Sequence, residues 1–418
     1  MASTKRKILM ISDHPLCSSG VGTQSRYLTH GLISTGKYTF RCLGAAQKHD
    51  KYDDIAPDPD LIIKPINGFG DRDMLRGLLI NEKPDALLIF NDPRFFIWAW
   101  EMEDEIHQIC PIVYNHLWDN LPVPRFNKVL YESTDLINCI NHDTYTFVSD
   151  WFPEKTNYIP HALPEALFHP VDDSIRLSAR ERLLGTDKKD NFLLLWVNRN
   201  ARRKQPGDLL SGWKNFITSH EIDTGKKPAA TLVMHTDPFD IEGPNLVEIV
   251  KLLELEDSVR FSNSRCEFSD MNAMYNAADS VINVSSAEGF GLGTLEAMYA
   301  GKPIIAHATG GMKRQVRDYR TGELNGIEMQ PDVKSLVGTQ MCPYIYEDFL
   351  SHSTIGNAIR TMYDKTHEER VSIGKRARAY AMREYNMDSL IKSWDASLTK
   401  TIDEWKVSKR PAWKQVSL

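Results

Sequence analysis

The sequence predicts an α/β protein made of two doubly wound, Rossmann-like domains with C-terminal helices. Short apolar runs alternate with amphipathic stretches, which is the pattern of parallel strands covered by helices. The pattern restarts near residue 192, so we expect two such domains in tandem, facing each other across a cleft. Ligands should bind beyond the carboxyl ends of the strands. The length of 418 residues fits this organisation.

The first half of the chain holds strand-like apolar runs separated by helical patterns, at residues 7–11, 38–44, 61–66, 86–90, 112–116, 136–140 and 157–162. Between residues 24 and 34, for example, Tyr27, Leu28 and Leu32 fall on one helical face. Three prolines within residues 159–173 mark a boundary. We therefore expect an N-terminal Rossmann-like domain at residues 1–162.

The second half repeats the alternation, with runs at residues 192–198, 230–236, 259–263, 280–286 and 303–308. These predict a C-terminal Rossmann-like domain at residues 163–385. From about Tyr344 the pattern indicates helices and no strand. Residues 386–418 should form a helix and a basic tail, with the helix packing back towards the N-terminal domain.

Composition restricts the function. Lys and Arg number 50 against 56 Asp and Glu, so the net charge is −6 and a broadly basic surface for nucleic acid is excluded, although a local basic patch is not. The six cysteines form no CxxC pair, which favours reduced thiols. Because no apolar run reaches the ~18 residues of a membrane span and the apolar start is too short for a signal peptide, we expect a cytoplasmic protein without integral membrane contact.

The most informative stretch is residues 285–311. An apolar strand leads into the loop S-S-A-E-G-F-G-L-G, and a helix is expected to open near Thr294. Free N–H groups at a helix start, together with the helix dipole, suit a phosphate. The backbone can approach a ligand closely at three glycines, Gly289, Gly291 and Gly293.

Two carboxylates flank these glycines. Glu288 lies on the loop, and Glu296 is expected in the first helical turn. A carboxylate beside a phosphate would repel it, so these acids should bind hydroxyls of a sugar and of a ribose. Backbone amides that can bind a phosphate, together with acids that can bind hydroxyls, indicate a nucleotide-sugar pocket. The alternative is a packing turn with two solvated glutamates.

The segment Glu288–Glu296, with Gly301-Lys302-Pro303 after it, resembles the E-x7-E motif of retaining GT-B glycosyltransferases of family 4. Gly310-Gly311 and Thr321-Gly322 also fit, and the resemblance covers residues 193–322 well and the first domain less well. It implies the GT-B fold and metal-independent transfer of a hexosyl or pentosyl group with retention. The donor would be a nucleoside-diphosphate sugar, UDP- or GDP-linked, with no tightly bound cofactor.

The family places an Arg after the first strand of the second domain and a Lys about five residues later, both on the donor diphosphate. Arg199 and Lys204 match this spacing, while Asn198 stands where the family has Gly. Taken alone, the segment could be a solvated basic turn. Arg202 and Arg203 receive no role.

In the first domain the resemblance places Gly20 against the donor phosphates, with Ser19 in place of the usual first Gly. An NAD-binding turn is the alternative, but Ser25 stands where its third Gly belongs. The resemblance also brings His116 to the donor sugar; a structural histidine is the alternative. His235, at a strand end, should line the donor pocket.

The predicted catalytic residues are Glu288, His116, Arg199 and Lys204. The amides of Leu292 to Thr294 should hold the distal phosphate. No metal ligand is expected, because the D-x-D sequences at 58–60 and 71–73 read as solvated turns. The predicted donor-binding residues are Gly20, Arg199, Lys204, His235, Gly289, Phe290, Gly291, Leu292, Gly293, Thr294 and Glu296.

The acceptor is open: a glycan, another metabolite or a hydroxymethylated base in DNA. Arg94, Trp98, Trp118 and Arg125, with the basic tail, could contact DNA by stacking and phosphate binding. Two other classes remain, a nucleotide-sugar epimerase of the same fold and a nonenzymatic binding module. The sequence does not predict the oligomeric state.

Overall fold

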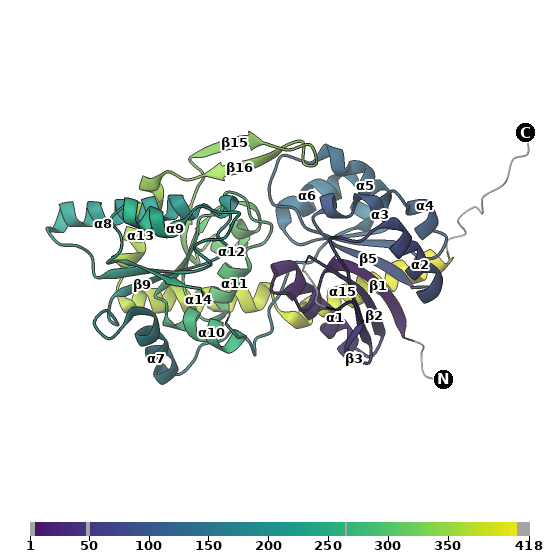
Figure 1. Ribbon diagram of the computed structural model, residues 1–418, viewed down its shortest axis with the longest axis horizontal. Coiled ribbons are helices and arrows are strands. Elements are labelled where there is room, and N and C mark those ends of the chain that lie inside the picture. Colours follow the sequence, from purple (N-terminus) through teal and green to yellow (C-terminus); the bar gives the residue numbers. More distant parts are fainter. Residues whose placement is uncertain (1–4, 47–50, 264–265, 408–418) are drawn as a thin grey trace, which may run out of the picture. The chain divides into compact units, whose positions relative to one another are not determined.

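The computed structural model describes residues 5–46, 51–263 and 266–407, and the chain divides into two compact units (Figure 1). Unit 1 is drawn from Met1–Trp118, Val123–His161 and Met387–Leu418. Unit 2 is drawn from Asp119–Pro122 and Ala162–Asn386. Residues 408–418, most of the basic tail that could contact a DNA acceptor, lie outside the described residues.

Unit 1 contains an eight-stranded sheet in the order β3-β4-β2-β1-β5-β6-β7-β8. Its neighbouring strands are parallel, apart from β3, which runs antiparallel to β4. Helices lie on both faces (Figure 1), which explains why every residue of strands β5 and β6 is buried. The strands are β1 (Arg6–Asp13), β2 (Tyr38–Ala45), β3 (Ile55–Asp58), β4 (Leu61–Pro65), β5 (Ala86–Asn91), β6 (Ile112–His116), β7 (Leu136–Cys139) and β8 (Thr156–Tyr158).

The helices of unit 1 include the C-terminal one, α15. Its buried side chains recur every four residues, at Leu390, Trp394, Leu398 and Ile402, so a single apolar stripe faces the unit. Gly31 of α1 lies against this helix. A Cβ at Gly31 would lie 2.2 Å from Ile391 Cδ1, so a larger residue there would displace Ile391. The helices are α1 (Gly20–Ser34), α2 (Arg72–Glu82), α3 (Ile97–Trp100), α4 (Glu103–Ile106), α5 (Lys128–Glu132), α6 (His142–Trp151) and α15 (Met387–Val407).

Polar contacts fix α15 along β1 and β2. The Arg6 guanidinium donates to both carboxylate oxygens of Asp403 at 2.9 and 3.0 Å, and the Tyr38 hydroxyl donates to Asp395 at 2.8 Å. The last described helix therefore belongs structurally to the unit that contains the start of the chain.

Unit 2 contains a six-stranded parallel sheet in the order β11-β10-β9-β12-β13-β14 and a separate antiparallel hairpin, β15–β16. Trp196 and Trp213 are fully buried in its core. The strands are β9 (Phe192–Val197), β10 (Ala230–His235), β11 (Val259–Ser262), β12 (Ser280–Asn283), β13 (Ile304–His307), β14 (Gly326–Met329), β15 (Val333–Val337) and β16 (Ile345–Phe349).

Helices flank this second sheet and follow its strands (Figure 1). They are α7 (Asp173–Leu184), α8 (Pro206–Thr224), α9 (Leu246–Leu252), α10 (Phe268–Ala277), α11 (Leu292–Tyr299), α12 (Lys313–Val316), α13 (His352–Tyr363) and α14 (His367–Glu384). The two Rossmann-like sheets and the C-terminal helices confirm the predicted fold class.

The expectation of no strand after Tyr344 is wrong, because β16 covers Ile345–Phe349. Its sequence hides the strand, since the buried positions are the acids Glu347 and Asp348 rather than apolar residues. Arg202 pairs with Glu347, and Lys334 pairs with Asp348 at 2.8 Å. Ion pairing, which local hydrophobic patterns do not report, allows these carboxylates to be buried.

Candidate functional site

Strands β9 and β12 are neighbours in the sheet of unit 2, with Val281 opposite Leu195. Parallel strands end at the same edge, so the turn after β9 and the glycine loop after β12 lie side by side. Lys204 and Glu288 are therefore brought together although 84 residues separate them.

Helix α11 begins at Leu292, two residues before the predicted start. Gly291 is its N-cap, with a φ of 94°, and no side chain caps the helix among the described residues. The first N–H groups of a helix have no partner within it, so this start presents donors for an anion. Because the helix starts early, Glu296 lies in its second turn; our placement in the first turn is wrong.

The glycine loop is held tightly from behind. A Cβ on Gly311 would lie 2.5 Å from the Phe290 Cα, and one on Gly310 would lie 2.0 Å from the Glu288 carbonyl oxygen. The Gly311 N–H donates to that carbonyl at 3.0 Å. The Gln315 amide donates to the Phe290 carbonyl at 2.7 Å. The loop therefore presents a fixed backbone.

Glu288 is paired with cations. The Lys204 ammonium donates directly to its carboxylate, and an Arg203 Nη1 lies 3.7 Å away. Burial raises the pKa of Glu288, but the attraction of Lys204 and Arg203 outweighs it and holds that pKa below its usual value. Burial lowers the pKa of Lys204 against the opposing pull of Glu288.

Arg199 does not join this cluster. Its guanidinium pairs with Asp240 at 2.7 Å and with Glu242 at 3.2 Å, and its side chain is 56% exposed. The hydrogen bond to Asp240 raises the pKa of Arg199. The expected meeting of Arg199 with the glycine loop is thus not observed, and its contact with a donor stays a prediction.

Glu296 and His235 also lie on the candidate donor side of unit 2. The Tyr275 hydroxyl donates to Glu296 at 2.6 Å, and burial raises the pKa of Glu296 to about 7 despite that bond. His235 ends β10, where its Nδ1 lies 3.0 Å from the Ser262 hydroxyl, and burial lowers its pKa. Glu296 can therefore change charge near neutral pH.

In unit 1, Gly20 is the first residue of α1, and the Ser19 side chain caps that helix by accepting from the Gly22 N–H at 2.9 Å. The Ser19 hydroxyl donates to Asp13. A Cβ on Gly22 would lie 2.4 Å from Cys17 Sγ. Ser19 thus occupies one of the first N–H groups of this helix, and the contact of Gly20 with a donor stays a prediction.

His116 is fully buried at the end of β6. Its Nε2 lies 2.7 Å from the Tyr131 hydroxyl, and the rings of Tyr114 and Phe147 surround it. Burial lowers the pKa of His116 to about 3, so the imidazole is neutral at pH 7. This environment fits the structural alternative, and a donor contact stays a prediction.

Arg203, Asp119 and Asp348 also lie at this site, although none of them is among the predicted site residues. Arg203 touches Glu288, and its Nε lies 3.8 Å from the Asp119 carboxylate. Asp348 is fully buried and accepts hydrogen bonds from Asn120, Thr309 and Lys334. The sequence offered one signal for such residues, a polar side chain soon after the end of a strand. Asp119 stands in such a position after β6.

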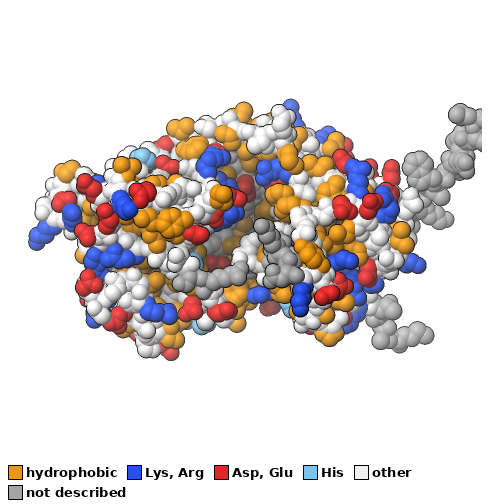
Figure 2. All heavy atoms as spheres, viewed as in Figure 1, with side chains coloured by type: hydrophobic (Ala, Val, Ile, Leu, Met, Phe, Trp, Pro, Cys, Tyr) orange, Lys and Arg blue, Asp and Glu red, His pale blue; other side chains and the backbone are white. Residues whose placement is uncertain are grey.

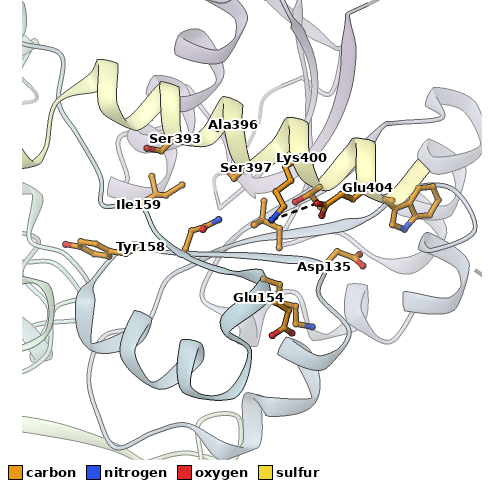
Figure 3. Close-up of a pocket in the computed structure, with 14 residues that line it drawn as sticks. Asp135, Glu154, Tyr158, Ile159, Ser393, Ala396, Ser397, Lys400 and Glu404 are labelled. Carbon is orange, nitrogen blue, oxygen red and sulfur yellow. Dashed lines mark ion pairs between the residues drawn. The ribbon is translucent and has the colours of Figure 1, made fainter. Parts of the chain in front are cut away.

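Unit 1 also carries a groove of about 540 Å³ between β8 and α15 (Figure 3). Asp135 and Glu154 face it from the sheet side, and Ser397, Lys400 and Glu404 face it from the helix. None of the predicted site residues lines it. We therefore place the candidate site at the glycine loop and not in this groove.

Figure 2 shows basic and acidic side chains interspersed over the visible surface, which fits the near balance of charges in the sequence. Within the described ranges, no three or more His, Cys, Asp or Glu side chains group so that they could hold a metal ion. No helix among these residues is long and apolar enough to cross a membrane.

Comparison with known proteins defines the class. The family model described as "Glycosyl transferases group 1" matches residues 186–335. A D-inositol 3-phosphate glycosyltransferase from Actinosynnema mirum is 30% identical over 293 residues, covering 67% of this chain and 68% of that protein. The chain belongs to the group 1 glycosyl transferase family.

Other relatives match over a shorter span. A D-inositol 3-phosphate glycosyltransferase from Salinispora arenicola is 42% identical over 177 residues, which is 41% of this chain and 38% of that protein. A relative of the same name from Frankia alni is 30% identical over 175 residues, 41% of each chain. The chain thus spans about two fifths of the length of these two relatives.

Solved structures share the fold over nearly the whole chain. Sucrose-phosphate synthase from Thermosynechococcus elongatus has a TM-score of 0.73 at 17% identity, covering 96% of this chain and 100% of that one. Anabaena Alr3699/HepE, in complex with UDP and glucose, has a TM-score of 0.68 at 17% identity, covering 94% and 100%. These neighbours show the GT-B fold.

Proposed function

We propose that this chain is a retaining glycosyltransferase that moves a hexosyl or pentosyl group from a nucleoside-diphosphate sugar to an acceptor hydroxyl, without a catalytic metal. The observation that carries the proposal is the uncapped start of α11, at Gly291, beside the Lys204–Glu288 pair. One place then offers amide donors, a cation for an anionic leaving group and a carboxylate for sugar hydroxyls.

The leaving diphosphate binds at the N–H groups of Leu292 to Thr294, where the positive end of the helix dipole favours it. Lys204 is shared between Glu288 and a phosphate oxygen, and so neutralises charge that grows on the leaving group. Glu288 accepts hydrogen bonds from sugar hydroxyls and stabilises the positive charge developing at the anomeric carbon. Glu296 accepts from the ribose hydroxyls when it is ionised.

Retention follows from attack on the face from which the phosphate departs. The acceptor hydroxyl forms the new bond to the anomeric carbon while the bond to the phosphate oxygen breaks. The departing phosphate takes the hydroxyl proton. This route requires no carboxylate nucleophile, unlike the double displacement of retaining hydrolases.

The donor is a UDP- or GDP-sugar, and UDP has the added support of the UDP-bound structural neighbour. The relatives named for D-inositol 3-phosphate favour a small hydroxylated metabolite or a glycan as acceptor. A hydroxymethylated DNA base is the other acceptor class. DNA would give an affinity that falls steeply with salt, and a flat response would reject it.

The test is turnover of labelled UDP- and GDP-sugars by the full chain, with and without candidate acceptors. We expect nucleoside diphosphate to be released, and the anomeric proton coupling of the product to match that of the donor. A product of inverted configuration would contradict retention. Conversion of the donor to an epimer without an acceptor would favour an epimerase, and no turnover of either donor class would contradict the proposal.

A further inference from the structure

The groove beside α15 in unit 1 has no part in the proposed transfer, and most of the side chains that line it are polar. Its volume of about 540 Å³ lies in the range of small-molecule sites, about 300–1,000 Å³. One wall is the helix α15, and the other is formed by β8 and the residues next to it. All of these residues belong to unit 1, so the groove is complete within one compact unit.

The helix wall is a single face of α15 that lies next to its buried apolar stripe. The lining positions recur every three or four residues, so they share one side of the helix over a rise of about 16 Å. The first three are small side chains, which leave space between the helix and β8. The lining positions of α15 are Ser393, Ala396, Ser397, Lys400, Thr401 and Glu404 (Figure 3), in addition to Trp405.

Several groups in this lining can take a new partner. Lys400 and Glu404 lie 3.9 Å apart with side chains 66% and 68% exposed, so their ion pair is weak. Ser393 and Glu154 are exposed, and neither makes a hydrogen bond or ion pair within the described part of the chain. Lys155, in contrast, already donates to two backbone carbonyls at 2.7 and 3.0 Å. The groove thus offers a hydroxyl, an ammonium and two carboxylates to a ligand.

A row of asparagines leads from the groove into the sheet. Asn157 of β8 lines the groove, Asn138 lies opposite it on β7, and Asn115 lies opposite Asn138 on β6. The Asn157 amide donates to the Asn138 Oδ1 at 3.2 Å. The Nδ2 of Asn138 and the Oδ1 of Asn115 are buried and have no partner among the described residues. Since buried polar groups are usually paired, hydrogen-bonding capacity remains beside the groove as well as in it.

The mixture of groups favours one class of ligand. Three carboxylates and two ammonium groups line the groove, so an anion such as a nucleotide would gain little charge attraction there. A sugar hydroxyl both donates and accepts, so it can pair with amide, hydroxyl, carboxylate and ammonium groups alike. Tyr158 lies at one end of the groove and Glu404, followed by Trp405, at the other (Figure 3). Such aromatic rings can pack against the apolar faces of sugar rings.

We propose that the groove beside α15 binds a short, uncharged oligosaccharide, at a site separate from the donor site of unit 2. The volume of the groove and the length of its helix wall fit a chain of a few sugar units. The proposal goes beyond the transfer reaction and does not depend on it, because no residue of the groove has a role in that reaction.

The test titrates the full chain with four uncharged or weakly polar probes, in the absence of any sugar donor. The probes are maltotriose, cellotriose, mannotriose and chitotriose, and binding is followed by ligand-detected NMR. We expect at least one of them to bind the wild-type chain. If none binds at millimolar concentration, the proposal is overturned.

Two adjacent residues of α15 provide the blocking variant and its matched control. Ser393→Trp places an indole in the groove and should weaken binding of that probe by more than about tenfold, because the ligand and the indole need the same space. Lys392 is also exposed but does not line the groove, since successive helical residues point about 100° apart. Lys392→Trp should leave binding unchanged.

A second variant removes a ligand group without filling the groove. Glu154→Ala should weaken binding about 3- to 10-fold, as loss of one hydrogen bond does, and the melting temperature should stay near wild type. Binding that Ser393→Trp leaves intact would place the probe at another site and overturn the proposal. Equal losses in Ser393→Trp and Lys392→Trp would overturn it as well.

Failure of the proposed function would give a different pattern. A chain that releases no nucleoside diphosphate from any sugar donor, but binds a trisaccharide that Ser393→Trp excludes, would contradict the transfer reaction and support this site. A chain that turns over its donor equally well in wild type and Ser393→Trp, but binds no trisaccharide, would leave the transfer reaction standing and overturn this site alone.

Discussion

Each unit has a strand that runs through a glycine-containing turn into a helix, yet the two helix starts differ in their capping and in the charges around them. In unit 1, between β1 and α1, Ser19 caps the helix and bonds to Asp13. In unit 2, between β12 and α11, Gly291 leaves the helix start uncapped by any described side chain, and Lys204, from the turn after β9, pairs with Glu288 of the loop.

The difference teaches that glycines in a turn do not define a phosphate site; unused amides and nearby cations do. At α1 the Gly22 N–H, the third of the helix, is already bonded to the Ser19 hydroxyl, which itself donates to Asp13. At α11 no described side chain caps the helix, and Lys204 and Arg203 contact Glu288, three residues before the N-cap Gly291. We therefore expect the diphosphate of the donor to bind on unit 2, and variants in the two turns should differ in their effects.

The largest effect should follow from the Lys204–Glu288 pair. Glu288→Gln and Lys204→Met should each reduce donor turnover by about 10²- to 10³-fold, which is the usual cost of removing one group that stabilises developing charge. Lys204→Met should also lower the free energy of unfolding by up to about 3 kcal/mol, because Glu288 loses its direct cation. Steady-state kinetics and urea unfolding measure both effects.

The double variant separates the two effects. Lys204→Met with Glu288→Gln should regain part of the lost stability, since no unpaired charge remains, but none of the lost activity. Activity near wild type in either single variant would remove that residue from the mechanism.

A methyl group added at Gly291 should have the next largest effect. A Cβ there would lie 2.8 Å from Met312 Cγ and from Thr294 Oγ1, and the φ of 94° disfavours any other residue. Gly291→Ala should therefore cost about 1–3 kcal/mol of stability and weaken donor binding about tenfold. Thermal melting and nucleotide titration measure the two. Gly20→Ala, on the helical first residue of α1, should change each less, and equal losses would break the contrast between the turns.

Glu296 should give a pH signature. Its pKa of about 7 lies above the ordinary value of about 4.3, so the folded protein holds this proton more tightly than the unfolded chain does. Between these two pH values, a rise in pH lowers the free energy of unfolding, and above about pH 7 the penalty is constant. Donor affinity should rise a few-fold through pH 7 as the carboxylate forms.

The Glu296→Gln variant provides the comparison. Relative to wild type it should gain stability as the pH rises from 5 to 8, and its donor affinity should stay flat across that range. Urea unfolding and the donor KM at several pH values measure this. Parallel pH profiles for the two proteins would show that Glu296 does not titrate here.

The smallest effect on function should come from the cap of α1. Ser19→Ala removes the bond to the Gly22 N–H and should cost about 1 kcal/mol, or about 2–4 °C in the melting temperature of unit 1. The donor KM should change far less than in Gly291→Ala. A KM that rises as much as in the Gly291 variant would mean that the first turn also binds the donor.

Features that depend on neighbouring residues could be predicted from the sequence, and features that depend on contacts between remote residues could not. Apolar strands such as β9 and the glycine loop are local patterns, and both were predicted. β16 was missed because its buried residues are acids whose partners are remote in sequence. The spacing of the motif identified Arg199, but the direction of its side chain is set by an ion pair with Asp240, 41 residues later. Arg203 meets Glu288 only because β9 and β12 are adjacent strands.

The most direct test of the central claim is a crystal structure of the chain with UDP bound, or GDP if titration shows that to be the preferred nucleotide. We predict that the phosphates lie within hydrogen-bonding distance of the N–H groups of Leu292 to Thr294 and of the Lys204 ammonium. A nucleotide whose phosphates lie instead at the start of α1, or in the groove beside α15, would contradict the account.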